Sequence, residues 1–436
     1  MTWRRRLLLG AAGVLVAAVA TLAVLRGQGA LFPGEDRSSR PLDHVTGRAD
    51  ADSAEVASLA RARCLLLSGD ERRACLQEFL LALVEQGRIR LAIGTLGRLG
   101  ARDAGIRRAG HEYSHVIGIN AWQPGKDLGE VYGQCSELFQ SGCYHGVIQA
   151  YFAWNGTDSA TVAGLCTSSP VISQTAWLRF QCVHGIGHAL VQARSLHLPR
   201  ALEGCDQLRG PYDQESCYGG AFMEFIVGAR GQSHHPRVGP PPADSAAEHG
   251  DHGDHDPAPA FALRDRNDLL YPCTAVGEKY RRQCYQMQPG IIYETANGDV
   301  GKLARACDGA PGPHRKSCYL GIGTYISGLT GRDAGRTIRI CSLGDPDFRE
   351  WCFVGVVKNF IDVTAKPGDG MDYCRLLEDP RIASRCYVAV GEQIAFLRLY
   401  MNDRRDACGA AEPRYVSACL FGAGLTGERP ADLVGT

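Results

Sequence analysis

Hydrophobic and polar residues follow two different patterns along this chain. Near the N-terminus, Leu7 to Leu25 form an apolar stretch without a charged residue, preceded by three arginines and followed by Arg26. A helix that rises about 1.5 Å per residue would cross a hydrocarbon core of about 30 Å over this stretch. Positive charge before the stretch favours a cytoplasmic N-terminus. We therefore predict a signal anchor over residues 1–26 and a single-pass protein whose bulk is periplasmic or extracellular.

A cleaved signal peptide is the alternative, because Ala18-Val19-Ala20 has the small-x-small form of a cleavage site. Both interpretations export the rest of the chain. Residues 27–55, with Gly, Pro, Ser and mixed charge, are predicted to be a tether.

The second pattern is a repeat of short apolar segments, each of which follows a cysteine. In the C-terminal half these cysteines are separated by 34, 34, 34 and 33 residues, a period typical of stacked helical units. The second position after the cysteine is apolar and the third is small. We predict a helical hairpin per unit, in which helix B starts at this cysteine and a proline-containing turn precedes it. The cysteines are Cys284, Cys318, Cys352, Cys386 and Cys419.

All 18 cysteines fall into neighbouring pairs, which predicts up to nine local disulfides that join the two helices of a unit. A bridge that closes so short a loop contributes about 2–3 kcal/mol. Disulfides persist in oxidising compartments, which agrees with export. The pairs are 64/75, 135/143, 166/182, 205/217, 273/284, 307/318, 341/352, 374/386 and 408/419.

The fold class that follows is all-α, a solenoid or curved superhelix of hairpins of about 34 residues. One unit, at Ala109 and Arg98, lacks both cysteines, as a pair within one unit requires. We divide the exported chain into N-terminal repeats (56–229), a His/Asp/Pro-rich flexible insertion (230–262), C-terminal repeats (263–425) and a tail (426–436).

In period and in the cysteine pair that joins two helices, residues 60–425 resemble the cysteine-rich Sel1-like and tetratricopeptide-type helical-repeat proteins. The resemblance implies stacked helical hairpins. It also implies protein binding on the repeat surface, because these families mostly mediate protein contacts.

The chain has 47 Lys and Arg against 47 Asp and Glu, so its formal net charge is zero. That balance argues against a globally basic nucleic-acid-binding protein. Since every cysteine fits the pairing scheme, a thiolate metal site or a cysteine nucleophile is disfavoured.

Histidines replace the apolar residue at the second position of the N-terminal units. They are His111, His145 and His184, and His115 and His188 follow one helical turn later in two of these units. Histidines at i and i+4 project from one face of a helix and can share an ion. The alternative is five core histidines, each bonded to a backbone carbonyl.

We favour a metal site, because burying five imidazoles without partners is costly. Packed helices lie about 8–10 Å apart, so the units at 109 and 182 would be about 16–20 Å apart in a straight stack. One ion would therefore require a tightly curved stack, and otherwise we expect two ions. Imidazole ligands outside the cytoplasm favour Cu or Zn.

Two carboxylates are candidate catalytic residues. Glu112 lies in His111-Glu-Tyr-Ser-His115, which matches the H-E-x-x-H pattern in which Glu is a general base. Glu224 lies in the following unit and could add a ligand or handle protons. Tyr113 and Tyr144 are outer candidates.

A second histidine cluster occurs in the insertion, as His249-Gly-Asp-His252-Gly-Asp-His255. It suits weak, exchangeable binding of Zn, Cu or Ni, and a solvated linker is the equal alternative.

The leading hypothesis is a membrane-anchored extracytoplasmic protein whose His-ligated Cu or Zn centre supports redox or hydrolytic chemistry. The alternative is a non-catalytic scaffold that binds a partner protein or handles metal, with the ion as a structural pin or as cargo.

Overall fold

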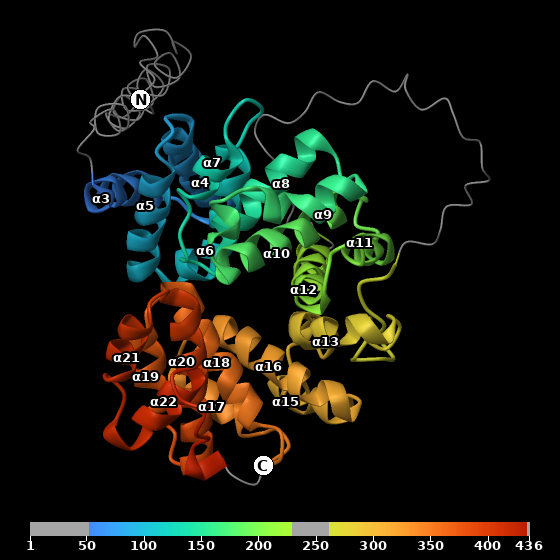
Figure 1. The fold of residues 1–436 in the computed structure, drawn as a ribbon, viewed down its shortest axis with the longest axis vertical. Helices are drawn as coiled ribbons and strands as arrows, with labels where there is room; N and C mark the ends of the chain where they lie inside the picture. The colour runs from blue at the N-terminus through green and yellow to red at the C-terminus, as the bar shows by residue number, and fades with distance from the viewer. Residues whose placement is uncertain (1–51, 229–260, 434–436) are drawn as a thin grey trace, which may run out of the picture. The chain divides into compact units, whose positions relative to one another are not determined.

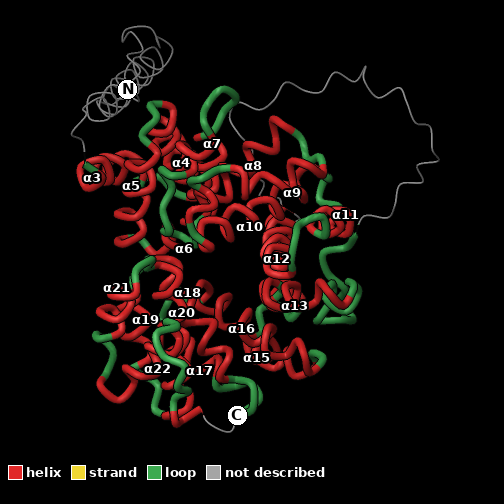
Figure 2. The backbone as a smooth tube through the Cα atoms, viewed as in Figure 1, coloured by secondary structure: helices red, strands yellow, loops and turns green. Residues whose placement is uncertain are grey.

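Within residues 52–228 and 261–433, which the computed structural model describes, the chain consists of helices joined by short loops (Figures 1 and 2). No β-strand occurs in these two ranges, where the only ladder contact is an isolated bridge between Asp265 and Asp268. The predicted all-α class is confirmed. The predicted membrane helix and the His-rich cluster at 249–255 lie outside the described residues. No described helix combines the length and the apolar character needed to span a bilayer.

One set of helices carries the second cysteine of each pair or, in α6, Ala109 at the equivalent position, and we call these the B helices. They pack against one another in chain order, each on the B helix before it (Figure 1). They are α4 (Gly69–Glu85), α6 (Ala104–Ala121), α8 (Gly142–Asn155), α10 (Ala176–Ala193), α12 (Pro211–Gly228), α13 (Glu278–Met287), α16 (Gly312–Leu329), α18 (Glu350–Thr364), α20 (Pro380–Leu397) and α22 (Val416–Gly422).

Most of the other helices, the A helices, precede a B helix and end at or near the first cysteine of the pair. They are α3 (Ser53–Cys64), α5 (Ile89–Arg102), α7 (Leu128–Tyr132), α9 (Ser159–Ser168), α11 (Leu198–Cys205), α15 (Val300–Ala306), α17 (Ala334–Cys341), α19 (Pro367–Cys374) and α21 (Met401–Cys408). An additional helix, α14 (Pro289–Thr295), follows α13, and the 3-10 turns are Ile172–Gln174, Cys307–Gly309, Pro413–Tyr415 and Ala431–Leu433.

The nine predicted disulfides are all present, and each joins the end of an A segment to the following B helix. Their Cα–Cα distances are 5.5–5.8 Å, within the normal range for a disulfide, and no cysteine is free. The unit without cysteines is also a hairpin, in which α5 packs against α6. The pairing inferred from spacing is therefore confirmed.

The start of the B helices differs from the prediction. Most of them begin one to two turns before the second cysteine, as α10 does at Ala176, ahead of Cys182. Several prolines of the preceding segment occupy the first helical positions, as Pro380 does in α20, whereas Pro346 lies in the turn before α18. Proline is favoured there because the first N–H groups of a helix have no partner within the helix.

The N-terminal and C-terminal repeats meet at the segment Phe139–Ser141, before α8. The backbone N–H groups of Phe139 and Gln140 donate to the carbonyls of Val363 and Asp362, at 3.2 and 3.0 Å. Both acceptors lie at the end of α18. The contact brings α6 and α8 close to α18 although the segments are far apart in the sequence.

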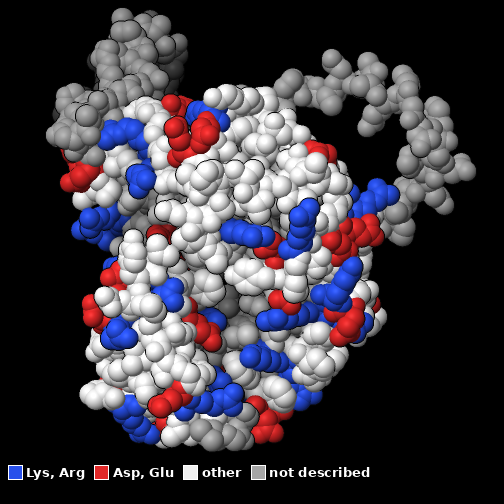
Figure 3. All heavy atoms as spheres, viewed as in Figure 1, with Lys and Arg blue, Asp and Glu red and all other residues white. Residues whose placement is uncertain are grey.

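Acidic and basic side chains are mixed over the face seen in Figure 3, in keeping with the zero net charge.

Candidate metal centre

Three consecutive B helices carry the five predicted histidines. His111 and His115 lie on α6, His145 on α8, and His184 and His188 on α10. The two helices with paired histidines have side-chain caps. Asp103 accepts a hydrogen bond from Ile106 N–H at the start of α6, and Thr175 does the same for Leu178 N–H in α10.

Glycines let these helices approach until their backbones touch. A Cβ atom added to Gly146 of α8 would lie 2.3 Å from the carbonyl oxygen of His115 on α6, and one added to Gly185 of α10 would lie 2.9 Å from the Cβ of Ile148 on α8. Both contacts are shorter than any real Cβ contact, so only glycine fits. These glycines occupy the third position after the cysteine, where the sequence predicted a close-packing contact.

The close approach brings all five imidazole rings into one cluster. Within a helix the ring centroids are 4.6 Å apart for His111 and His115 and 5.1 Å apart for His184 and His188. His145 lies between the pairs, 5.2 Å from His115 and 4.7 Å from His184. Across two steps of the stack, His115 and His188 are separated by only 4.8 Å, far less than a straight stack allows.

Every ring also bonds an oxygen acceptor through one nitrogen. Because these oxygens accept a hydrogen bond and cannot donate one, the bonded nitrogen carries the hydrogen and the other nitrogen presents its lone pair. The bonds are His111 Nδ1 to Phe139 O (2.8 Å), His115 Nδ1 to Gln149 Oε1 (2.7 Å), His145 Nε2 to Gln181 Oε1 (2.9 Å), His184 Nδ1 to Ser216 O (3.1 Å) and His188 Nδ1 to Glu224 Oε2 (2.8 Å).

Glu224 sets the direction of several of these bonds. Its carboxylate accepts from His188, from Gln149 Nε2 at 3.2 Å and from Gln192 Nε2 at 3.0 Å. Since the amide nitrogen of Gln149 points to the carboxylate, its amide oxygen must face His115. The buried carboxylate therefore fixes the tautomers of two histidines, the arrangement by which proteins orient metal-binding imidazoles.

The remaining lone pairs point toward one another. His115 Nε2 lies 3.2 Å from His111 Nε2 and 3.3 Å from His145 Nδ1, and neither nitrogen of these pairs carries a hydrogen in the tautomers above. Ligand atoms of two sets lie within 4.8 Å of one another, His111/His115/His145 and His145/His184/His188. We call them the first and the second triad.

Burial keeps the central rings neutral. Desolvation, followed by the repulsion of neighbouring imidazoles, holds the pKa of His145 and His184 well below the usual value. Among the described residues, Nε2 of His184 has no hydrogen-bond partner. Neutral imidazole is the form that ligates a metal.

A cavity of about 280 Å³ opens beside the cluster. His145 and His184 contribute to its wall, and so do Lys358 and Asp362 of α18 and Gln393 of α20. Gln393 donates to the carboxyl of Asp362. Desolvation raises the pKa of Asp362 to about 7, although Lys358 and the bond from Gln393 oppose the shift.

The candidate catalytic carboxylates differ in position. Glu224 is buried and bonded to His188 within the cluster. Glu112 instead lies 3.6 Å from the guanidinium of Arg73, and it is not part of either triad. Of the outer candidates, Tyr144 donates its hydroxyl to the carbonyl of Cys135 at 3.2 Å, and Tyr113 is buried on α6.

Sequence reasoning missed the oxygens that hold the rings. Gln149 was visible, because it occupies the coordinate of His115 and His188 in its own unit. Gln181 and the carbonyl of Phe139 gave no signal. Phe139, Gln140 and Ser141 all have positive φ angles, of 55°, 55° and 62°, in the left-handed region. Such strain is common at functional sites.

No known protein family, curated protein or solved structure matches this chain.

Proposed function

We propose that the histidine cluster is a transition-metal centre in a membrane-anchored, extracytoplasmic helical-repeat protein. The observation that carries the proposal is the pair of nitrogen–nitrogen distances of 3.2 and 3.3 Å between lone pairs of the first triad. Zinc binds imidazole nitrogen at about 2.0–2.1 Å, so two nitrogens of a tetrahedral site lie about 3.3–3.4 Å apart. Without a cation, these lone pairs would repel one another.

A proton is a poor substitute for the cation. It satisfies one of the two contacts at most, and the lowered pKa of His145 opposes protonation at the centre of the cluster. A metal ion satisfies all three nitrogens together, and the bonded oxygens already hold each ring in the ligating tautomer.

The donor set favours Cu or Zn. Imidazole suits both ions, and the nine disulfides indicate an oxidising compartment, where these metals are the leading candidates. The first and second triads share His145, which can serve one ion through Nδ1. We therefore propose one tightly held ion, with room for a second only at the expense of the hydrogen bond to Gln181.

The neighbouring cavity favours a catalytic centre over a structural pin. Three histidine ligands leave a coordination position open. Since His145 and His184 line the cavity of about 280 Å³, a substrate there would reach the ion. The chemistry we propose is hydrolytic with Zn or redox with Cu.

The test is metal analysis of the exported chain. Purified protein is expected to hold Cu or Zn, and His111→Ala and His115→Ala, each of which removes a ligand of the first triad, are expected to lose it. His197→Asn is the matched control, because His197 caps α11 outside the cluster and Asn is also a good cap. Metal-free wild-type protein that takes up neither ion would refute the proposal.

Cobalt(II) substitution separates the two candidate roles. Four-coordinate cobalt absorbs visible light strongly, and added azide should change the spectrum if a position is open. An unchanged spectrum, combined with unfolding on metal removal, would identify a structural pin and support the scaffold alternative.

A further inference from the structure

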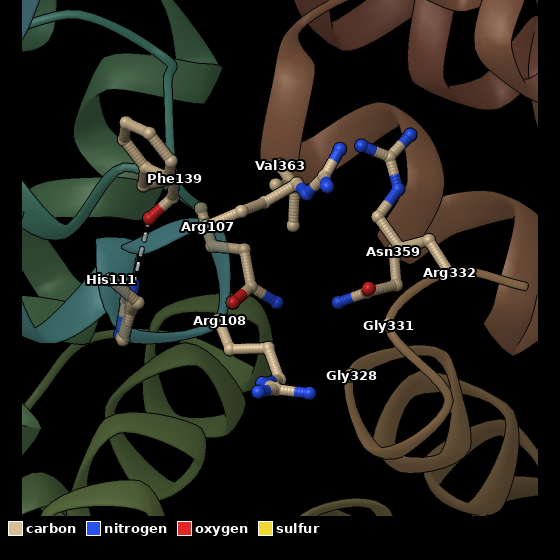
Figure 4. Close-up of a pocket in the computed structure, with 10 residues that line it drawn as sticks. Arg107, Arg108, His111, Phe139, Gly328, Gly331, Arg332, Asn359 and Val363 are labelled. Carbon is tan, nitrogen blue, oxygen red and sulfur yellow. Dashed lines mark hydrogen bonds between the residues drawn. The ribbon is translucent and has the colours of Figure 1, made fainter. Parts of the chain in front are cut away.

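A smaller cavity of about 70 Å³ adjoins His111 of the first triad (Figure 4). Arg107 and Arg108 line it from α6, one helical turn before His111. Arg332, which follows α16, and Asn359 of α18 line the opposite side. Figure 4 shows the side chains of these residues converging on the gap between the N-terminal and C-terminal repeats.

The polar side chains around this cavity offer hydrogen-bond donors. The three arginines have donors and no acceptor. The amide oxygen of Asn359 already accepts a bond from the hydroxyl of Ser327 at 2.6 Å, so its NH₂ group is the part left for a ligand. In Figure 4 that NH₂ group points into the gap. None of the residues that line the cavity is acidic.

The positive charge is only partly balanced. Arg332 forms an ion pair with Asp369 at 3.0 Å and donates to the carbonyl of Phe360 at 3.1 Å. Among the described residues, the guanidinium groups of Arg107 and Arg108 have no ion-pair or hydrogen-bond partner. Burial lowers the pKa of Arg332, and repulsion from Arg107 adds to that shift although Asp369 opposes it.

We propose that this cavity binds the oxyanion group of a ligand, a phosphate or a carboxylate, against the imidazole of His111. Arginine guanidinium groups bind both oxyanions through paired hydrogen bonds. A cavity of this volume holds a group of a few heavy atoms rather than an extended chain. The negative charge of the bound group would balance the positive charge of the arginines.

The anion cavity would give the proposed metal centre a class of ligand. Only its connection with the metal rests on the proposed function. His111 is shared, because its Nε2 faces His115 while its ring lines the cavity. An anionic substrate held by the arginines would thus be anchored directly beside the first triad.

The experiment uses the metal-free exported chain, so that a phosphate cannot bind an ion instead. Isothermal titration calorimetry with inorganic phosphate, and separately with acetate, measures affinity for the wild type, Arg107→Gln and Arg108→Gln. The control is Arg266→Gln, which removes the same charge at an exposed residue outside the cavity. Circular dichroism checks that each variant is folded.

We expect saturable binding of one anion, weakened about tenfold or more in both cavity variants, the size of a lost charge-assisted hydrogen bond. The control should keep wild-type affinity once the salt concentration is matched. The tighter of the two anions identifies the group. No saturable binding of either anion at millimolar concentration, or equal weakening by the control, would overturn the proposal.

The two proposals fail separately. A chain that binds phosphate through Arg107 and Arg108 yet takes up no metal keeps the anion site and loses the metal centre. A chain that holds metal yet binds neither anion in the metal-free state loses only the anion site.

Discussion

Glu224 is the residue on which the hydrogen-bond directions of the histidine cluster depend. Its carboxylate is buried and accepts from His188, Gln149 and Gln192. A buried carboxylate with three donors is well compensated, whereas an uncompensated one would be costly. The negative charge of this carboxylate also attracts a cation to the neighbouring triads.

Replacing this carboxylate should weaken metal binding without unfolding the chain. In Glu224→Gln the negative charge is lost, and the new NH₂ group must face one of three donors. We expect a 10–100-fold loss of metal affinity, the usual effect of removing a partner that orients a ligand. Competition with a chromogenic chelator measures the affinity.

Glu215→Gln is the matched control, because Glu215 lies on the same helix and pairs with Arg282 at the surface. It should retain wild-type affinity. Equal affinities for the wild type and Glu224→Gln would show that the carboxylate does not orient a ligand.

For single residues, the sequence predicted the positions of the histidines on the helices better than the atoms to which they bond. The five histidines share repeat coordinates, so the period predicted that they lie on one face, but it left open whether all five rings meet. Glu112 lies outside both triads, and its side chain pairs with Arg73, a partner that the short motif did not indicate. The bonds that the carbonyls of Phe139 and Ser216 accept from His111 and His184 are invisible in sequence, because any residue offers a carbonyl and only its place in space selects it.

Neighbouring B helices come into direct contact at glycines, with no side chain between them. Interaxial distances of 8–10 Å assume side chains between helices. In this chain Gly146 and Gly185 remove those side chains at the points of contact, and the rings of His115 and His188 meet across α8. The sequence showed the small residues but not the curvature to which they lead.

Adding a methyl group at this contact should separate α6 from α8. In Gly146→Ala the new Cβ would collide with the carbonyl oxygen of His115, and backbone cannot yield as a flexible side chain does. We expect the free energy of unfolding to fall by about 1–3 kcal/mol or more. Urea denaturation measures it, and metal analysis should show weaker binding as well.

Gly164→Ala provides the control within α9, where an added Cβ meets nothing within 4 Å. Alanine is the better helix former, so this variant should be stabilised by about 0.5–1 kcal/mol. A Gly146→Ala variant as stable as the wild type would mean that the helices can separate at little cost, and that the contact does not determine the cluster.

On the scale of the whole described chain, both cavities need residues from both sets of repeats. Gln140 lines both of them, and its N–H bonds the carbonyl of Asp362. The C-terminal repeats therefore form part of the walls of both cavities. Their role could not be predicted, because the contact between Phe139–Ser141 and α18 joins segments more than 200 residues apart through backbone groups.

Asp362 should make stability depend on pH at this contact. Desolvation raises the pKa of Asp362 to about 7 in the folded protein. In the unfolded chain the pKa of this group is about 3.9, the typical value for Asp, and each unit of difference between the two pKa values corresponds to about 1.4 kcal/mol. Between these pH values the folded state binds more protons, so the free energy of unfolding contributed by this group falls as pH rises and is lost above about pH 7.

Asp362→Asn, which can still accept from Gln393, should show a shallower fall of the unfolding free energy in urea denaturation between pH 4 and 7. The variant Asp406→Asn, at an exposed residue, should follow the wild type. If the unfolding free energy of all three proteins depends on pH in the same way, Asp362 does not bind the proton, and it is not a neutral group in the cavity beside His145.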